Sequence, residues 1–129
     1  MQGFAIDPAI CRPEDSGLEP TPGTAQTQTF TQQRVAAREE KQYGPFRVAS
    51  GTLLEAKMQS DGSRGDPDLY VRFGTEPQRS IYDCRPFLVG ADETCSLDVP
   101  SEKDQAFVML HGYRTGGYNL TIIHTPPAQ

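Results

Sequence analysis

Residues 106–123 read AFVMLHGYRTGGYNLTII and hold the strongest strand pattern in the chain. Val108 and Leu110 alternate with residues that point to the opposite face, and the same period of two returns after residue 117. The Arg-Thr-Gly-Gly sequence at 114–117 is typical of a tight hairpin turn. The stretch therefore predicts two antiparallel strands, each with one face in a hydrophobic core.

The same period of two recurs in shorter runs throughout the rest of the chain. The expected strands are residues 30–37, 46–49, 53–58, 69–73, 80–84, 95–99, 106–113 and 118–123. A short helix over 35–41 is an alternative to the end of the first strand. Gly and Pro, with 12 and 11 residues, interrupt long helices and favour turns. The pattern predicts an all-β fold, an antiparallel jelly-roll-like β-sandwich of roughly seven or eight short strands.

Length and charge limit the function classes. A chain of 129 residues corresponds to one domain. We expect a Pro/Thr/Gln-rich tail or linker at 1–29, the sandwich at 30–125 and a C-terminal tail at 126–129. The net charge of −5 argues against a nucleic-acid partner, which requires a basic face. No apolar run approaches the length of a membrane span.

Three cysteines bear on the cellular compartment. Cys84 and Cys95 have ten residues between them, a spacing that suits a hairpin-like loop closed by a disulfide. Such a bond stabilises by roughly 3 kcal/mol and implies an oxidising compartment. Two buried reduced thiols are the alternative. Cys11 is left over and is free, removed, or paired between chains. No signal peptide is visible, so a secreted form implies a leader that was removed or replaced.

Three segments carry a resemblance to a known family. They read GDPDLYVRFG at 65–74, YDCRPF at 82–87 with ETC at 93–95, and FVMLHGY at 107–113 followed by GYNL at 117–120. In order and spacing they resemble the bacterial pre-peptidase C-terminal domain. The resemblance covers roughly residues 42–125 and leaves out the chain before residue 30.

The resemblance implies a β-sandwich attached to secreted bacterial proteins, most often proteases, as a non-catalytic module. Related collagen-binding modules of secreted collagenases contact their substrate through an aromatic strand, whose matching position here is Tyr113. A second aromatic position of that family falls on His111 in this chain. From the strand pattern alone, Tyr70, Tyr113 and Tyr82 face outward, unless they pack under loops. We therefore take Tyr113, His111 and Tyr70 as candidate ligand-binding residues.

Calcium is the candidate cofactor. Some relatives of the family bind it through carboxylates that compare with Glu39, Glu40, Asp66 and Asp68 in this sequence. Calcium takes six to eight oxygen ligands, and Asp61, Asp66 and Asp68 surround one Gly-rich loop. The alternative is that Asp66 and Asp68 cap the turn by accepting backbone N–H bonds.

No catalytic motif occurs in the sequence. The two histidines, His111 and His124, belong to no recognisable nucleophile, zinc or phosphate motif, so we predict a non-enzyme. The first functional hypothesis is an extracellular accessory module that binds a protein or polysaccharide polymer. The second is a structural or assembly subunit, in which the tail 1–29 docks on a neighbouring sandwich to build an extracellular oligomer or filament.

Overall fold

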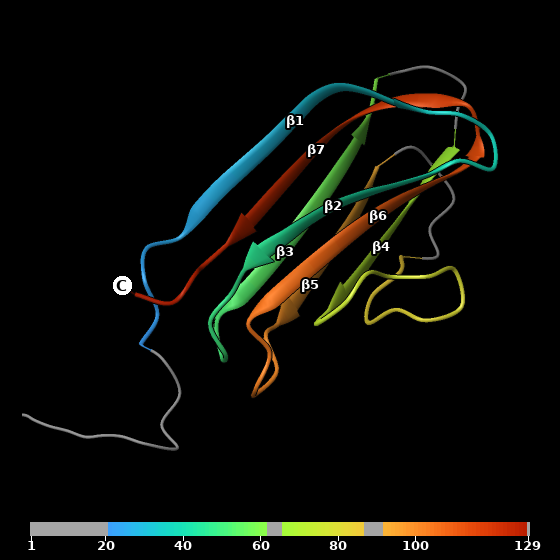
Figure 1. Cartoon of the computed structure of the whole chain (residues 1–129). Helices are drawn as coiled ribbons and strands as arrows, with labels where there is room; N and C mark the ends of the chain where they lie inside the picture. Colours follow the sequence, from blue (N-terminus) through green and yellow to red (C-terminus); the bar gives the residue numbers. More distant parts are fainter. Residues whose placement is uncertain (1–20, 62–65, 87–91, 129) are drawn as a thin grey trace, which may run out of the picture.

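The computed structural model describes residues 21–61, 66–86 and 92–128 and contains seven strands in two facing sheets (Figure 1). The strands are β1 (Gln26–Val35), β2 (Glu40–Arg47), β3 (Leu53–Ser60), β4 (Asp66–Phe73), β5 (Glu93–Asp98), β6 (Gln105–Arg114) and β7 (Gly116–His124). All neighbouring strands pair antiparallel, so the predicted β-sandwich is confirmed. The described residues contain no helix, and hence none that could span a membrane.

Successive strands are distributed between the two sheets. The four-stranded sheet has the order β1-β7-β3-β5, and the three-stranded sheet has the order β2-β6-β4. The predicted hairpin at 114–117 is therefore wrong, because β6 pairs with β2 and β4 while β7 pairs with β1 and β3. Each of these two strands is an inner strand of its own sheet and has two hydrogen-bonded neighbours there.

The core lies between the sheets and is made of the inward-facing residues that the period of two predicts. Its buried members include Leu54, Ala56, Met58, Leu69, Val71, Phe73, Ala106, Val108, Leu110, Tyr118, Leu120 and Ile122. On the side of β1 and β2, the Tyr118 hydroxyl donates to the Tyr43 hydroxyl over 2.6 Å, and Tyr43 donates to Gln33. The deeply buried hydroxyl of Tyr118 is thus satisfied by a partly buried tyrosine.

Residues at both ends of the described chain take part in the fold. β1 begins at Gln26, so residues 26–29 belong to the sheet. The helix alternative at 35–41 is wrong, because β1 runs to Val35 and β2 starts at Glu40. Residues 126–128 also lie in the fold: the Gly23 amide donates to the Pro126 carbonyl, and the Ala128 amide donates to the Thr21 carbonyl, each over 2.7 Å. Residues 1–20, with Cys11 and most of the proposed docking tail, lie outside the described residues.

The strand expected at 80–84 is replaced by an irregular segment, residues 74–86, which we name the cover segment. It contains isolated bridges between Gln78 and Ile81 and between Val71 and Cys84. It runs beside β4 and lies over the outward face of the three-stranded sheet (Figure 1). No strand forms here because the chain turns back on itself between Gln78 and Ile81, and only Cys84 forms a bridge with β4.

Candidate functional site

The free edge of β4 is closed by side chains and by the cover segment. The Leu69 amide donates to the Glu93 carboxylate over 2.7 Å, and the Val71 amide donates to the Cys84 carbonyl over 2.9 Å. The Phe73 amide donates to the Asp83 carboxylate over 2.7 Å. From Leu69 to Phe73, every second residue of β4 thus has its outward amide bonded, and this edge offers no template for another strand.

The expected disulfide between Cys84 and Cys95 is present, with the two Cα atoms 6.1 Å apart. The alternative of two reduced thiols is therefore wrong. The bond does not close a hairpin, because Cys84 lies in the cover segment and Cys95 lies in β5 of the opposite sheet. It joins the two layers of the sandwich at the side where Glu93 reaches β4.

Three carboxylates meet at this side of the sandwich. Oxygen atoms of Asp66, Asp68 and Glu93 all lie within 4.8 Å of one another, and we name this group the carboxylate cluster. Burial, together with the charges of Asp68 and Asp66, raises the pKa of Glu93 to about 7, although its hydrogen bond from Leu69 lowers it. Burial also raises the pKa of Asp68, and the nearby Asp66 charge adds to this. The cluster is therefore electrostatically strained when all three groups are ionised.

The cluster differs from the carboxylate set expected from the sequence. Asp66 and Asp68 come together as predicted, but Glu39 and Glu40 do not join them. Glu39 instead accepts a 2.8 Å hydrogen bond from the Ala36 amide in the β1–β2 turn. Glu40 is exposed at the start of β2. The two residues lie in the β1–β2 turn and at the start of β2, and β6 separates β2 from β4.

Glu93 is the cluster residue that the sequence reasoning missed. It opens β5 only two positions before Cys95 and is 2% exposed. A single acidic residue at the start of a strand ordinarily faces solvent, so its type gave no signal. The disulfide position was the only available hint, because it fixes β5 beside β4. Asp61, the other expected carboxylate, contacts Gly117 and is outside the cluster.

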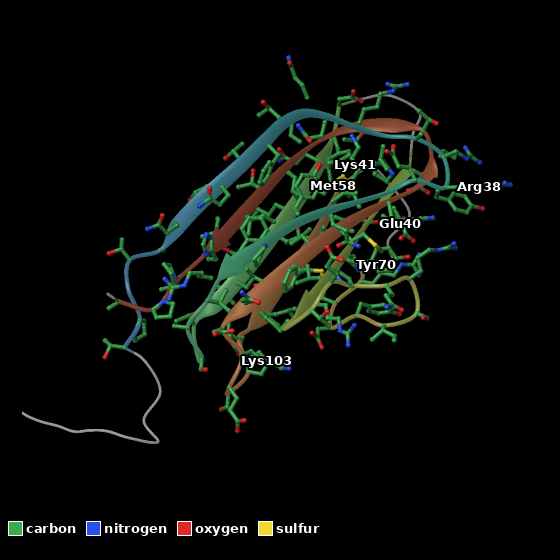
Figure 2. The ribbon with its side chains drawn as sticks, viewed as in Figure 1. Arg38, Glu40, Lys41, Met58, Tyr70 and Lys103 are labelled. Atoms are coloured by element: carbon green, nitrogen blue, oxygen red, sulfur yellow. A yellow bond between two sulfur atoms is a disulfide. The ribbon has the colours of Figure 1, made fainter. Side chains whose placement is uncertain are left out.

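Tyr70 points to the outer face of the three-stranded sheet but is buried there. It is 2% exposed, its ring meets the Tyr82 ring at 5.5 Å, and the Arg85 guanidinium lies 5.1 Å from its centre. Figure 2 shows Tyr70 beside the cover segment. Of the two alternatives left open for Tyr70, the structure shows the second, because the cover segment packs on its ring. In this structure Tyr70 offers almost no accessible surface to a ligand.

His111 and Tyr113 lie on the same outer face and differ in exposure. His111 is 5% exposed, and its Nδ1 atom lies 3.9 Å from a carboxylate oxygen of Asp68 and has no hydrogen-bond partner within the described part of the chain. Asp68 is also paired with Arg85 over 3.6 Å. Tyr113, in contrast, is 64% exposed at the end of β6. Of the three candidate ligand-binding residues, Tyr113 alone presents a large accessible surface.

Comparison with known proteins finds similarity to bacterial proteases. The chain is 31% identical over 113 residues to alkaline serine exoprotease A of Vibrio alginolyticus, a match that covers 85% of this chain and 21% of that protein. It is 38% identical to the virulence metalloprotease of Vibrio anguillarum, over 59% of this chain and 12% of that protein. It is 46% identical to an extracellular protease of Xanthomonas campestris, over 37% of this chain and 8% of that protein. The chain thus spans only a small part of each relative, and no family model matches it.

Proposed function

We propose that this chain is a non-catalytic extracellular accessory module of the pre-peptidase C-terminal type, which binds a polymeric substrate or partner surface. One observation carries the proposal. A protein named a serine exoprotease and a protein named a metalloprotease both match this chain over more than half of its length. Their names indicate different catalytic groups, so a region common to both serves a task other than bond cleavage. The small share of each relative that is matched agrees with an accessory part.

The disulfide supports an extracellular location. Disulfides of this structural kind persist in oxidising compartments and are rare in reducing ones. One of the relatives is named an extracellular protease, which agrees with that compartment. The bond also holds the cover segment, and with it the outer face, in one arrangement.

The surface around Tyr113 is the proposed contact with the polymer. Tyrosine presents a rigid ring with a polar end and loses little conformational entropy on binding. At 64% exposure, Tyr113 has no internal packing role that accounts for so large an aromatic side chain. The polymer is a protein fibre or a cell-wall polysaccharide.

The Tyr113→Ala variant is expected to weaken retention on an insoluble polymer about tenfold, because one aromatic anchor contributes about 1.4 kcal/mol. The measurement is co-sedimentation of the purified chain with insoluble collagen, cellulose, chitin and peptidoglycan. The Leu53→Ala variant is the matched control, since Leu53 is 48% exposed on the other sheet. Equal retention of wild type and Tyr113→Ala on every matrix that binds would remove this surface from the proposal.

We further propose that the carboxylate cluster holds a calcium ion. The three carboxylates fit as a partial ligand set, because calcium prefers oxygen and tolerates irregular geometry. One Glu93 oxygen already accepts the Leu69 amide, which leaves the other for a cation. The Asp68–Arg85 ion pair competes for the same carboxylate. Bound calcium would compensate both the burial of Glu93 and the repulsion between the carboxylates, which together raise the pKa of Glu93.

Calcium at about 10 mM is expected to raise the melting temperature by about 5 °C at pH 8, given the millimolar affinity usual for extracellular sites. At pH 5 the increase is expected to be smaller, since Glu93 is then protonated. Thermal unfolding followed by circular dichroism measures both. Equal melting temperatures with calcium and with chelator at pH 8 would exclude the ion from the cluster.

The Glu93→Gln variant separates the cluster from general salt effects. The folded pKa of about 7 lies above the ordinary value of 4.5, so the folded state keeps a proton that the unfolded chain has released. The free energy of unfolding therefore falls as pH rises from about 4.5 to about 7, by at most about 3 kcal/mol. Glutamine still accepts the Leu69 amide and carries no charge. We expect Glu93→Gln to flatten this pH dependence and to abolish the calcium response together.

A further inference from the structure

A hollow of about 350 Å³ lies directly beside Tyr113. Its lining comes from the β1–β2 turn, the cover segment and β6, and consists of Arg38, Arg79, His111, Gly112 and Tyr113. Among the residues that the structure describes, two arginines line it and no acidic residue does, although the chain as a whole carries a net charge of −5. A local positive charge in an acidic protein calls for a specific explanation.

Arg79 belongs to the cover segment and lines the hollow on that side. Burial raises the pKa of the Tyr70 hydroxyl, and the nearby positive charges of Arg85 and Arg79 lower it. Tyr70 is itself fixed by Tyr82 and by Arg85. Arg79 thus reaches the hollow from the cover segment, above the packed rings of Tyr70 and Tyr82.

Arg38 is held by its backbone at the same end of the sandwich (Figure 2). It has a positive φ of 69°, and its amide donates to the Gly112 carbonyl over 2.6 Å. The Gly112 amide in turn donates to the Glu39 carbonyl over 2.9 Å. The turn that carries Arg38 is thus tied to the floor of the hollow.

Neither arginine is neutralised by a neighbour within residues 21–61, 66–86 and 92–128, where no ion pair joins Arg38 or Arg79 to a carboxylate. The adjacent Glu39 carboxylate is turned to the Ala36 amide. The negative charge of Asp68 lies behind His111 and is paired with Arg85. The two guanidinium groups therefore remain available to an external anion.

We propose that this hollow is a subsite for the acidic side chain of a protein ligand. Guanidinium groups match the planar carboxylate in geometry as well as in charge. The volume is at the lower limit of ligand pockets, which suits one side chain, while the exposed Tyr113 ring packs along the rest of the peptide. A protein is chosen over a polysaccharide because the relatives are named proteases, so this choice rests on the proposed function.

The test is a titration of the ¹⁵N-labelled full chain, followed by NMR, with two blocked peptides of sequence Gly-Glu-Gly-Glu-Gly and Gly-Gln-Gly-Gln-Gly. The glutamate peptide is expected to shift the amides of Gly112 and Tyr113 and to bind about fivefold more tightly than the glutamine peptide, a preference that added salt reduces. Equal affinity for the two peptides would overturn the proposal.

Variants locate the binding. Arg38→Gln and Arg79→Gln are each expected to remove most of the preference for glutamate. Arg47→Gln is the matched control, because Arg47 is an exposed arginine at the other end of β2. Retained preference in both Arg38→Gln and Arg79→Gln would place the anion elsewhere and reject the subsite.

A third ligand separates the sources of the carboxylate. Polygalacturonate is titrated under the same conditions, and binding to it without binding to the glutamate peptide would replace the protein ligand with an acidic polysaccharide and overturn the proposal. Glutamate preference combined with unchanged matrix retention in Tyr113→Ala would preserve the subsite while rejecting the Tyr113 surface. The two proposals therefore fail in distinguishable ways.

Discussion

The Gly112→Ala variant is expected to lose about 3 kcal/mol of unfolding free energy, which is a large share of the stability of a single domain. An added Cβ atom would lie far inside van der Waals contact of the Ala36 carbonyl oxygen. The obstacle is backbone, which cannot rotate away as a side chain can. Gly112 also exchanges hydrogen bonds with the turn through Arg38 and Glu39, so any shift disturbs both.

Urea unfolding followed by circular dichroism measures this effect. The Gly51→Ala variant is the matched control, because a Cβ atom added at Gly51 would meet nothing within 4 Å, although this residue has a positive φ of 81°. It is expected to lose only about 1 kcal/mol, the cost of the left-handed backbone alone. If Gly112→Ala were as stable as Gly51→Ala, the close approach of β6 to the turn would not exist in solution.

Removal of the disulfide is the second large effect. The double variant Cys84→Ala/Cys95→Ala is expected to lose about 3 kcal/mol and to melt about 15 °C lower, because the bond closes a loop of sequence separation 11 and joins the two sheets. Alanine is used because Cys95 is 1% exposed, and a serine hydroxyl would be buried there without a partner.

A reducing agent gives an independent measurement. It is expected to lower the melting temperature of the wild type toward that of the double variant and to leave the double variant unchanged. Reduction also frees the cover segment from β5, so the glutamate preference at Arg79 is expected to weaken with it. A double variant that melts at the wild-type temperature would contradict a structural role for the bond.

The inward faces of the strands could be predicted from the sequence because the period of two is strong in them. Leu54, Ala56 and Met58 face the core as expected, and Leu53 faces solvent. The neighbours of each strand could not be predicted in this way. A period of two says which residues face inward, but it is the same whether the next strand pairs in a hairpin or crosses to the other sheet. The residues at 114–117 are compatible with a hairpin and equally with a connection that crosses to the other sheet.

The candidate site was only partly predictable for a related reason. Tyr113 is exposed, as its strand pattern predicts, whereas Asp66 and Asp68, which were expected in a Gly-rich loop, lie in β4. Glu93 joins the carboxylate cluster only because β5 lies beside β4, which is a property of the whole fold. Tyr70 faces outward by its pattern, yet the cover segment buries it.

The strand order of the two sheets has a consequence for how the chain acquires its structure. β6 and β7, the central strands of the two sheets, follow all their partners in sequence. Until residues 105–124 emerge from the ribosome, β2 and β4 lack their shared partner, and so do β1 and β3. Neither layer can be completed before that point. The earlier strands therefore have no finished sheet to join until the last two strands have been made.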